Sequence, residues 1–248
     1  NINVSGGGAF INQYNNAGYT NISGLDIFFD ISGVTNVSGF TKDDILITEA
    51  GTDFSGLLGS DLIEISGSLY KIALDLSTVT SPKTYLIQIS GESFNASGGD
   101  NDGSGNTLSE FTLNFDPTLP TINGSVDISS NNTSYDTSAG VSGSVVTVSF
   151  TSDELLSGAS VTLKDITDTV VTNFSGITMT SSDQLTWNIS GVIAPDQVDS
   201  SGIKYDIFMR DLAGNVNTSG GSSSFIIDTT LPTINGSVDI SSNNTSFD

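Results

Sequence analysis

The residues with the clearest chemical potential in this sequence carry side-chain oxygens and lie just outside stretches that are typical of strands. They are Asp116, Asp153, Glu154, Asp211, Asn215 and Asp228. If they converge at one end of a folded unit, their carboxylates repel one another unless a cation lies between them. Ca²⁺ suits such a set, because it accepts about six to eight oxygen ligands in flexible geometry. The pattern predicts a structural calcium site, with solvated turn residues and caps as the alternative.

A second candidate for cation binding is the acidic loop at residues 100–105. Its alternating oxygens, on Asp100 and Asp102, resemble the start of an EF-hand loop. The position of the bidentate ligand is taken by Phe111, however, and Glu110 falls one place short. An ion site is therefore weighed here against a flexible acidic turn.

Catalytic chemistry has little support in the residue types. The chain has no Cys and no His, which removes thiolate chemistry and the usual general base. The neighbouring carboxylates Asp43 and Asp44 are expected on extended backbone, where adjacent side chains point to opposite faces and cannot form an acid and base pair. We therefore expect no enzyme. Trp187 and Tyr205 fall in the apolar phase of their strands, so they are expected in a core rather than stacked on a sugar.

Short runs of alternating apolar residues must position these side chains. Leu25, Ile27 and Phe29 alternate with polar residues, and residues 146–150 show the same period. A period of two predicts half-buried strands, and no stretch has a convincing helical period. Clusters of Gly, Ser, Asn and Asp between the runs suit tight turns. The chain is therefore predicted to be all-β and of the β-sandwich class.

The charge composition excludes some partners. Six Lys and Arg face 28 Asp and Glu, so the net charge is −22, although only 14% of residues are charged and 36% are hydrophobic. A phosphate backbone is repelled by this field, whereas divalent cations are concentrated by it. No apolar run approaches the ~18 residues that a membrane span needs. We expect a folded protein without a nucleic-acid partner and without a membrane span in this segment.

A long internal repeat sets the domain organisation. Residues 116–136 return as residues 228–248, a spacing of 112 residues, with only Pro117 to Thr229 and Tyr135 to Phe247 changed. This period exceeds the ~20–50 residues of a solenoid repeat and fits a whole small domain. We expect one β-sandwich over 1–116 and a second over 117–228. Residues 229–248 are then the first strand of a third repeat, or a strand donated to a neighbour.

The connections between the predicted domains are short. Almost no residues separate one domain from the next, and Pro120 and Pro232 fix φ in the two linkers. Neighbouring domains are then held at a defined angle rather than swivelling. The array is expected to be a stiff rod.

Asn-x-Ser/Thr sequons are frequent. They occur at Asn3, Asn21, Asn36, Asn95, Asn123, Asn131, Asn132, Asn173, Asn188, Asn217, Asn235, Asn243 and Asn244. Each is an acceptor for N-glycosylation in a secreted protein. Asn188 lies between Trp187 and Ile189, whose side chains are expected to point inward, so a glycan has room on the outer face. A composition rich in Asn and Ser is the alternative explanation.

Two stretches resemble a known family. Asp211-Leu212-Ala213-Gly214-Asn215, followed by Ile227-Asp228-Thr229-Thr230-Leu231-Pro232, resembles the closing of bacterial immunoglobulin-like domains in large surface adhesins. Val37 to Ile45 is similar to the stretch after the second strand of such domains. The first domain departs from the pattern in its closing loop, where Gly91 to Asn95 stand in place of Asp211 to Asn215.

The resemblance implies tandem immunoglobulin-like β-sandwich domains at a cell surface. In that family such domains build stalks, adhesins and surface layers, and calcium often stiffens the junctions. We expect an extracellular structural repeat protein that forms a rigid stalk, surface layer or filament, stiffened by calcium and glycosylated, whose partners are further copies of the domain or chain. The alternatives are an adhesin module that binds a glycan or cell-surface ligand, and a filament subunit that polymerises by strand donation.

Overall fold

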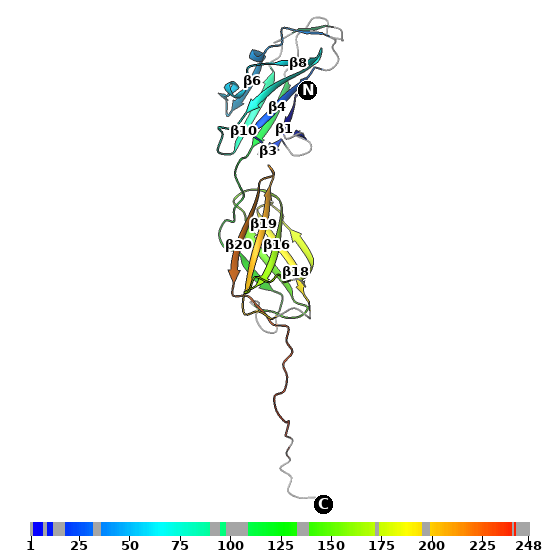
Figure 1. The fold of residues 1–248 in the computed structure, drawn as a ribbon, viewed down its shortest axis with the longest axis vertical. Coiled ribbons are helices and arrows are strands. Elements are labelled where there is room, and N and C mark those ends of the chain that lie inside the picture. Colours follow the sequence, from blue (N-terminus) through cyan, green and yellow to red (C-terminus); the bar gives the residue numbers. More distant parts are fainter. Residues whose placement is uncertain are drawn as a thin grey trace, which may run out of the picture.

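The protein is all-β and consists of two tandem β-sandwiches, which follow one another along the long axis of the molecule (Figure 1). The computed structural model describes residues 2–6, 9–11, 18–31, 36–89, 95–97, 109–132, 139–171, 174–194, 199–239 and 241. Over these residues there is no α-helix, and the helical turns are two short 3-10 helices, η1 (Lys42–Asp44) and η2 (Ser55–Leu57). Neither is long and apolar enough to cross a membrane.

The first sandwich packs two five-stranded sheets face to face. One has the order β2 (Ala9–Ile11), β1 (Ile2–Gly6), β4 (Gly24–Asp30), β9 (Leu69–Asp75) and β8 (Ile63–Ser66). The other has the order β3 (Tyr19–Thr20), β12 (Ser109–Phe115), β10 (Lys83–Ile89), β6 (Ile45–Glu49) and β7 (Thr52–Asp53). β5 (Asn36–Ser38) and β11 (Asn95–Ser97) form a separate pair.

The core of the first sandwich comes from the predicted alternation. Leu25, Ile27 and Phe29 of β4 are buried, and so are Tyr85 and Ile87 of β10 on the opposite sheet. Each buried side chain of this size contributes about 1.5–3 kcal/mol relative to leaving it exposed. The polar residues between them face outward, as a period of two requires.

The second sandwich is also built from two layers. Its four-stranded sheet has the order β13 (Asp127–Ser130), β15 (Val145–Thr151), β18 (Thr186–Ile193) and β17 (Phe174–Thr180). The facing layer contains β16 (Leu156–Asp165), β19 (Ile203–Asp211) and β20 (Val216–Ser223), with the short pair β14 (Ala139–Gly140) and β21 (Ile226–Ile227). Among the described strands, only the β3–β12 and β14–β21 pairs are parallel.

The two aromatic residues assigned to the second core lie where the sequence predicts. Trp187 is buried, and its indole N–H donates to the Gln184 carbonyl at 3.2 Å. Tyr205 is half-buried and packs against the same core. Its ring lies over Gly221, where an added Cβ would stand 2.4 Å from the tyrosine hydroxyl oxygen. A glycine is therefore required at this position of β20.

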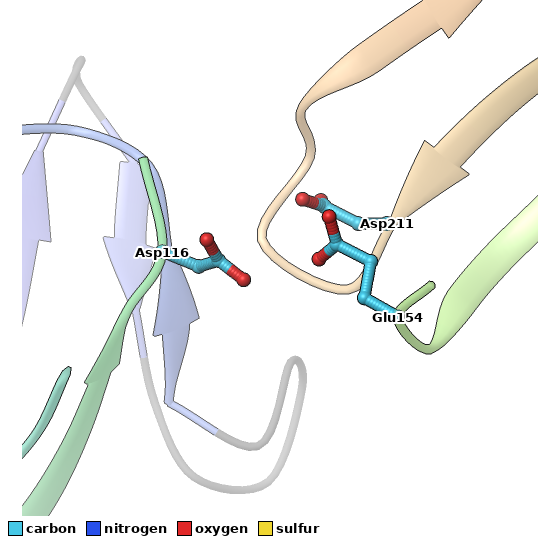
Figure 2. Close-up of side chains that lie close together, drawn as sticks. All are labelled: Asp116, Glu154 and Asp211. Carbon is cyan, nitrogen blue, oxygen red and sulfur yellow. The ribbon is translucent and has the colours of Figure 1, made fainter. Parts of the chain in front are cut away.

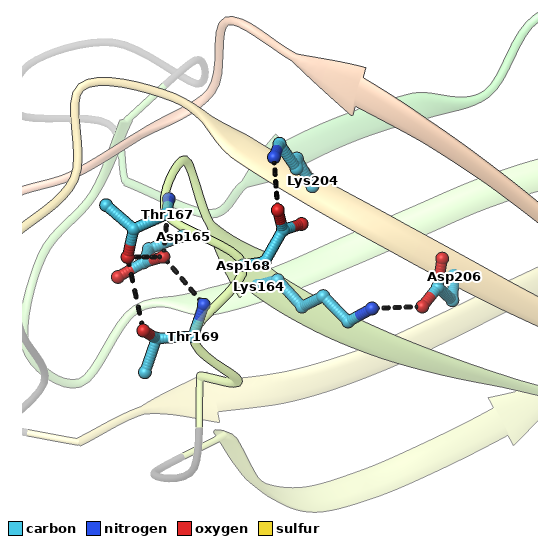
Figure 3. Close-up of polar contacts among 7 residues, drawn as sticks. All are labelled: Lys164, Asp165, Thr167, Asp168, Thr169, Lys204 and Asp206. Atoms are coloured by element: carbon cyan, nitrogen blue, oxygen red, sulfur yellow. Dashed lines mark hydrogen bonds and ion pairs between the residues drawn. The ribbon is translucent and has the colours of Figure 1, made fainter.

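Lysines on the outward side of β16 and β19 pair with aspartates (Figure 3). Lys164 pairs with Asp206, and Lys204 donates to Asp168 at 2.8 Å. In the turn after β16 the Thr167 hydroxyl, together with the backbone N–H groups of Thr169 and Thr167, lowers the pKa of Asp165. These partly exposed pairs fix the turn geometry rather than supply much stability.

The two apolar cores are separate along the chain. The buried residues of the first lie between Ile2 and Phe115, and those of the second between Ile128 and Ile227. The domain limits at residues 116 and 228 stay predictions, because core membership does not fix where a domain ends.

Residues 229–239 form no strand and follow the second sandwich as an extended segment (Figure 1). Leu231, Ile234 and Val238 are 81%, 77% and 68% exposed. These apolar side chains have no core in the part of the chain that the structure describes.

Candidate metal centre at the domain junction

Three carboxylates from both sandwiches approach one another at the junction (Figure 2). Asp116 directly follows β12, Glu154 lies between β15 and β16, and Asp211 ends β19. One carboxylate oxygen of each lies within 4.8 Å of the other two. The group therefore spans the boundary between the sandwiches.

Asp211 is the fixed member of the group. It is 1% exposed, and one of its oxygens accepts the backbone N–H groups of Gly214 at 2.6 Å and Asn215 at 2.8 Å. Gly214 has a φ of +96°, which suits glycine in this tight turn between β19 and β20. The other oxygen accepts the Asn215 side-chain amide at 2.7 Å. The turn thus holds a buried carboxylate in one orientation.

Burial and the neighbouring carboxylates together favour the protonated form of Glu154. Its pKa is raised to about 8, by burial first, and then by the charge of Asp116, a hydrogen bond with that carboxylate, and the charges of Asp211 and Asp153. Without a cation, Glu154 therefore holds a proton near neutral pH. A bound cation would replace that proton.

Asp116 is oriented by its own linker. Its side chain accepts the Thr118 backbone N–H at 3.0 Å and the Thr118 hydroxyl at 2.5 Å. Its backbone N–H donates to the Thr20 carbonyl at 2.9 Å, which ties the end of β12 to β3. The first sandwich therefore presents this carboxylate in a defined place.

Asn215 joins the two sides of the junction. Its amide nitrogen donates to the Asp116 carbonyl at 2.8 Å as well as to Asp211, and its amide oxygen accepts from Asn21 at 2.9 Å. Asn217 adds a further contact, because its amide nitrogen donates to the Pro120 carbonyl at 2.9 Å. The Asn215 oxygen is engaged with Asn21, so this residue positions the carboxylates instead of offering a free ligand.

A cavity of about 570 Å³ opens beside the carboxylates. Its walls combine Asp116 and Glu154 with apolar residues from both sandwiches, among them Pro82, Leu119 and Leu212. Water can therefore reach the group and complete the coordination of an ion.

The donor set fits a hard cation. All donors are oxygens, and the chain has neither the His nor the Cys that transition metals prefer. Each of the three carboxylates has an oxygen within 4.8 Å of the other two, and water would complete the roughly six to eight oxygen ligands that Ca²⁺ accepts. Asp116, Glu154 and Asp211 would hold the ion, which would supply positive charge between them.

Asp153 lies close to this group but has another task. It is exposed, and its two oxygens accept the Thr121 backbone N–H at 2.7 Å and the Thr121 hydroxyl at 2.6 Å. These bonds fasten the linker to the second sandwich just before β13. Asp153 borders the cavity without joining the three-carboxylate cluster.

The expectation that Asp228 converges with Asp211 and Asn215 is wrong. Asp228 is exposed at the opposite end of the second sandwich, where its backbone N–H donates to the Gly140 carbonyl at 3.0 Å. Its carboxylate accepts the Thr230 backbone N–H at 3.2 Å. The cause is strand direction: β19 runs toward the junction, and β20 is antiparallel to it and carries the chain away. Asp116 occupies the position at this junction that was assigned to Asp228.

The sequence contains two further pairs of acidic residues, Asp100 with Asp102 and Asp43 with Asp44. Asp100 and Asp102 lie outside the described residues. Asp43 and Asp44 lie in η1, not on a strand, and Asp44 accepts the Thr41 backbone N–H at 2.7 Å in a capping box. Asp44 therefore acts as a local cap.

The sequons fall into distinct environments. Asn123, Asn131, Asn188 and Asn235 are exposed, whereas Asn132 is buried. The amide nitrogens of Asn21 and Asn217, to which a glycan would be attached, donate hydrogen bonds at the junction. The side chains of Asn3, Asn36 and Asn95, and all of Asn173, Asn243 and Asn244, lie outside the described structure.

Sequence reasoning treated Asn21 and Asn217 as sequons and missed their contacts at the junction. Asn21 is 194 residues from its partner Asn215, a separation no local pattern reveals. Asn217 does carry a usable signal, because it follows Asn215 by two residues and so shares its face at the start of β20.

Comparisons with known proteins identify no sequence family. No family model matches the chain, and no curated protein matches it. Among solved structures, the chain is similar to a titin A168169 substructure at 12% identity, covering 85% of this chain and 91% of that one, with a TM-score of 0.24. The N-terminal Ig1-2 module of the Drosophila receptor protein tyrosine phosphatase DLAR gives 11% identity, 79% and 92% coverage, and a TM-score of 0.23. Scores this low carry no argument, so the fold description rests on the chain's own strand pairings.

Proposed function

We propose that this chain is an extracellular structural protein whose tandem sandwiches form a rigid stalk, surface layer or filament, with Ca²⁺ stiffening the junction. The observation that carries the proposal is the convergence of Asp116, Glu154 and Asp211 across the boundary between the sandwiches. A cation held by all three bridges the two sandwiches, because Asp116 leaves the first and the other two belong to the second.

A bound cation would neutralise carboxylate charges that otherwise repel one another at this site. The pKa of Glu154 is raised by burial first and then by the neighbouring carboxylates, whose repulsion a divalent ion would remove. Binding to the folded junction but not to the unfolded chain stabilises the fold by mass action. The ion therefore couples the stability of the second sandwich to its angle with the first.

The surface location and the partners rest on composition and resemblance. A net charge of −22 and the frequent sequons are typical of an exposed, glycosylated array in a medium that supplies divalent ions. The Asp211 to Asn215 loop, similar to that of bacterial surface adhesins, points the same way. The partners proposed are further copies of the same domain or chain.

Calorimetric titration of the chain with CaCl₂ tests the site. We expect one Ca²⁺ per junction, and at least about tenfold weaker binding in Glu154→Gln, which removes one ligand charge. Asp127→Asn is the matched control, because it removes the same charge from an exposed position on β13 of the same sandwich. Equal binding by both variants, or no binding by the wild type, overturns the calcium site.

A second candidate function is ligand binding by the first sandwich. A cavity of about 500 Å³ there is lined by Phe40, Lys42, Asp61, Glu64 and Tyr70, among others. This mixture of charged groups and aromatic edges suits a polar ligand such as a glycan. A glycan array probed with wild type and with Lys42→Met tests it: loss of a specific signal in the variant supports binding, and an array without any signal removes this candidate.

A further inference from the structure

The outward face of the sheet formed by β16, β19 and β20 carries a row of large side chains on its central strand. Asp206, Phe208 and Arg210 occupy every second position of β19, and a period of two places all three on the same face. Phe208 is 39% exposed, although it is an aromatic residue in the middle of a regular sheet. Val216, which lies opposite Arg210 on β20, is 44% exposed. Two large apolar side chains of this face are therefore in contact with water.

Arg210 is the only arginine of the chain, and within the described residues it makes no ion pair. The ion pairs of that part of the chain are made by Lys71, Lys83, Lys164 and Lys204. A guanidinium presents its N–H donors in a planar fork that matches a carboxylate. The exposed guanidinium is therefore available to a carboxylate of another molecule, and this chain itself supplies 28 Asp and Glu.

The charges on β19 are arranged symmetrically about Phe208. Asp206 lies two residues before it and Arg210 two residues after it, which is about 7 Å on either side along an extended strand. A second copy can pack the same face against the first with its β19 antiparallel, related by a two-fold axis that passes between the two Phe208 rings. Asp206 then lies opposite the partner's Arg210, and symmetry repeats this pair on the other side.

The strands on both sides of β19 fit the same arrangement. On β20, Val216 lies beside the arginine and Gly220 beside the aspartate. On β16, Gly158 and Thr162 occupy the corresponding positions. The two-fold axis places Val216 over the partner's Gly220 and Thr162 over the partner's Gly158, so each larger side chain faces a glycine. The two sheets can therefore approach to the ~10 Å that is usual for packed sheets.

Asp206 has a carboxylate oxygen to offer to this contact. Its Oδ2 accepts from Lys164 of the same sheet (Figure 3). Its Oδ1 lies over Gly220, only 2.9 Å from the position that a Cβ would take there. The absence of a side chain at Gly220 thus leaves room for this oxygen on the outer face, where the guanidinium of a partner can reach it.

We propose that the outward face of β16, β19 and β20 is a contact surface for a second copy of this chain, packed face to face about a two-fold axis at Phe208. Phe208 and Val216 form the apolar centre of the contact, and the pairs of Asp206 with the partner's Arg210 flank it. These pairs select the antiparallel orientation, because the parallel one places like charges opposite each other. The surface shares no residue with the carboxylate cluster at the junction, so the contact does not depend on calcium.

Sedimentation equilibrium in EDTA tests this contact, at about 0.15 M salt, where long-range repulsion between the acidic chains is screened. The chain concentration is raised to about 1 mM, because small interfaces bind weakly. We expect wild-type dimers and at least about tenfold weaker association of Arg210→Asp and of Asp206→Arg, since each variant places like charges opposite each other. An equimolar mixture of the two variants should dimerise again, because every charge then meets its opposite.

A second pair of variants tests the apolar centre without changing a charge. Phe208→Ser should weaken the dimer, whereas Met179→Ser should not, because Met179 is 47% exposed on β17 of the opposite sheet. This pair and Arg210→Asp decide the matter if Asp206→Arg, which also breaks the pair with Lys164, does not fold. A wild type that stays monomeric over the whole concentration range overturns the proposal. Equal association of the two serine variants, or a mixture of folded charge variants that stays monomeric, overturns it as well.

Discussion

At the scale of single residues, Asn215 organises the junction through geometry, not charge. It is buried, donates to Asp211 and to the Asp116 carbonyl, and accepts from Asn21. An amide can do all of this at once because it has two donor hydrogens and an acceptor oxygen. A carboxylate at the same position would repel Asp211, and an apolar residue would leave that buried oxygen with fewer donors.

Replacing Asn215 with Ala should therefore loosen the junction. Asp211 loses one of its three N–H donors and the Asp116 carbonyl loses its side-chain donor, so we expect the second sandwich to lose about 1–3 kcal/mol of stability. Chemical denaturation measures the loss. Asn235→Ala, in the exposed segment, is the control, and equal midpoints for the two variants would show that Asn215 does not hold the junction.

The pH dependence of stability should report on Glu154. Without a cation its pKa is about 8, against an ordinary 4.5, so between these values the folded chain binds more protons than the unfolded chain. Stability then falls as pH rises from about 4.5 to 8. In EDTA we expect the thermal midpoint of the second sandwich to fall across this window, and Glu154→Gln to flatten the fall. Identical pH profiles for wild type and variant would exclude this titration.

At the scale of elements, the contact of β19 with β20 depends on the absence of a side chain at Gly221. An added Cβ would stand 2.4 Å from the Tyr205 hydroxyl oxygen and 2.5 Å from Cζ of its ring. Gly221→Ala should therefore push the ring off its position and cost about 1–3 kcal/mol, as overpacking does.

Gly158→Ala is the matched control for this substitution. Gly158 lies on β16, in the same sheet, and an added Cβ there meets no atom within 4 Å. We expect its urea midpoint to equal or exceed that of wild type. If both alanine variants unfold at the same urea concentration, the close approach of Tyr205 does not constrain β20.

The sequence predicted the all-β sandwich fold because alternation is a local signal. Leu25, Ile27 and Phe29 bury one face of β4, and Val146, Val148 and Phe150 do the same in β15, as their spacing required. η1 is not predicted by the sequence pattern, because Thr41 and Asp44 form their capping box within a stretch whose Asp43 and Asp44 are expected on extended backbone.

The candidate site was only partly predictable, because its members come together through topology. Asp211 and Asn215 share one loop, so sequence reasoning placed them together. Asp228 was assigned to the same end because it follows in the chain, but β20 and β21 lead it to the other end. The repeat shows which of the two aspartates belongs at this end: Asp116 precedes the second sandwich at the position at which Asp228 begins the next copy.

At the scale of the whole molecule, negative charge opposes close contact between the sandwiches. Charges separated by more than about 8 Å are largely screened at physiological salt, so most of the net charge of −22 acts only locally. Within the part of the chain that the structure describes, the exception is the junction, where three carboxylates meet within one screening length. The angle between the sandwiches is therefore set by what happens at this one place.

Removing divalent ions should make the rod bend. In the proposed junction, a bound Ca²⁺ would hold the sandwiches in line together with the contacts of Asn215 and Asn217, whereas in EDTA only the hydrogen bonds would remain, against carboxylate repulsion. We expect small-angle scattering in EDTA, at 0.15 M salt and pH above 8, to show a shorter mean end-to-end distance and a broader distribution of interdomain angles. Glu154→Gln should show a smaller difference between Ca²⁺ and EDTA than wild type at the same Ca²⁺ concentration, because it lacks one ligand charge. A wild-type rod that stays equally straight in EDTA would mean that the hydrogen bonds alone set the angle, and the ion would lose its mechanical role.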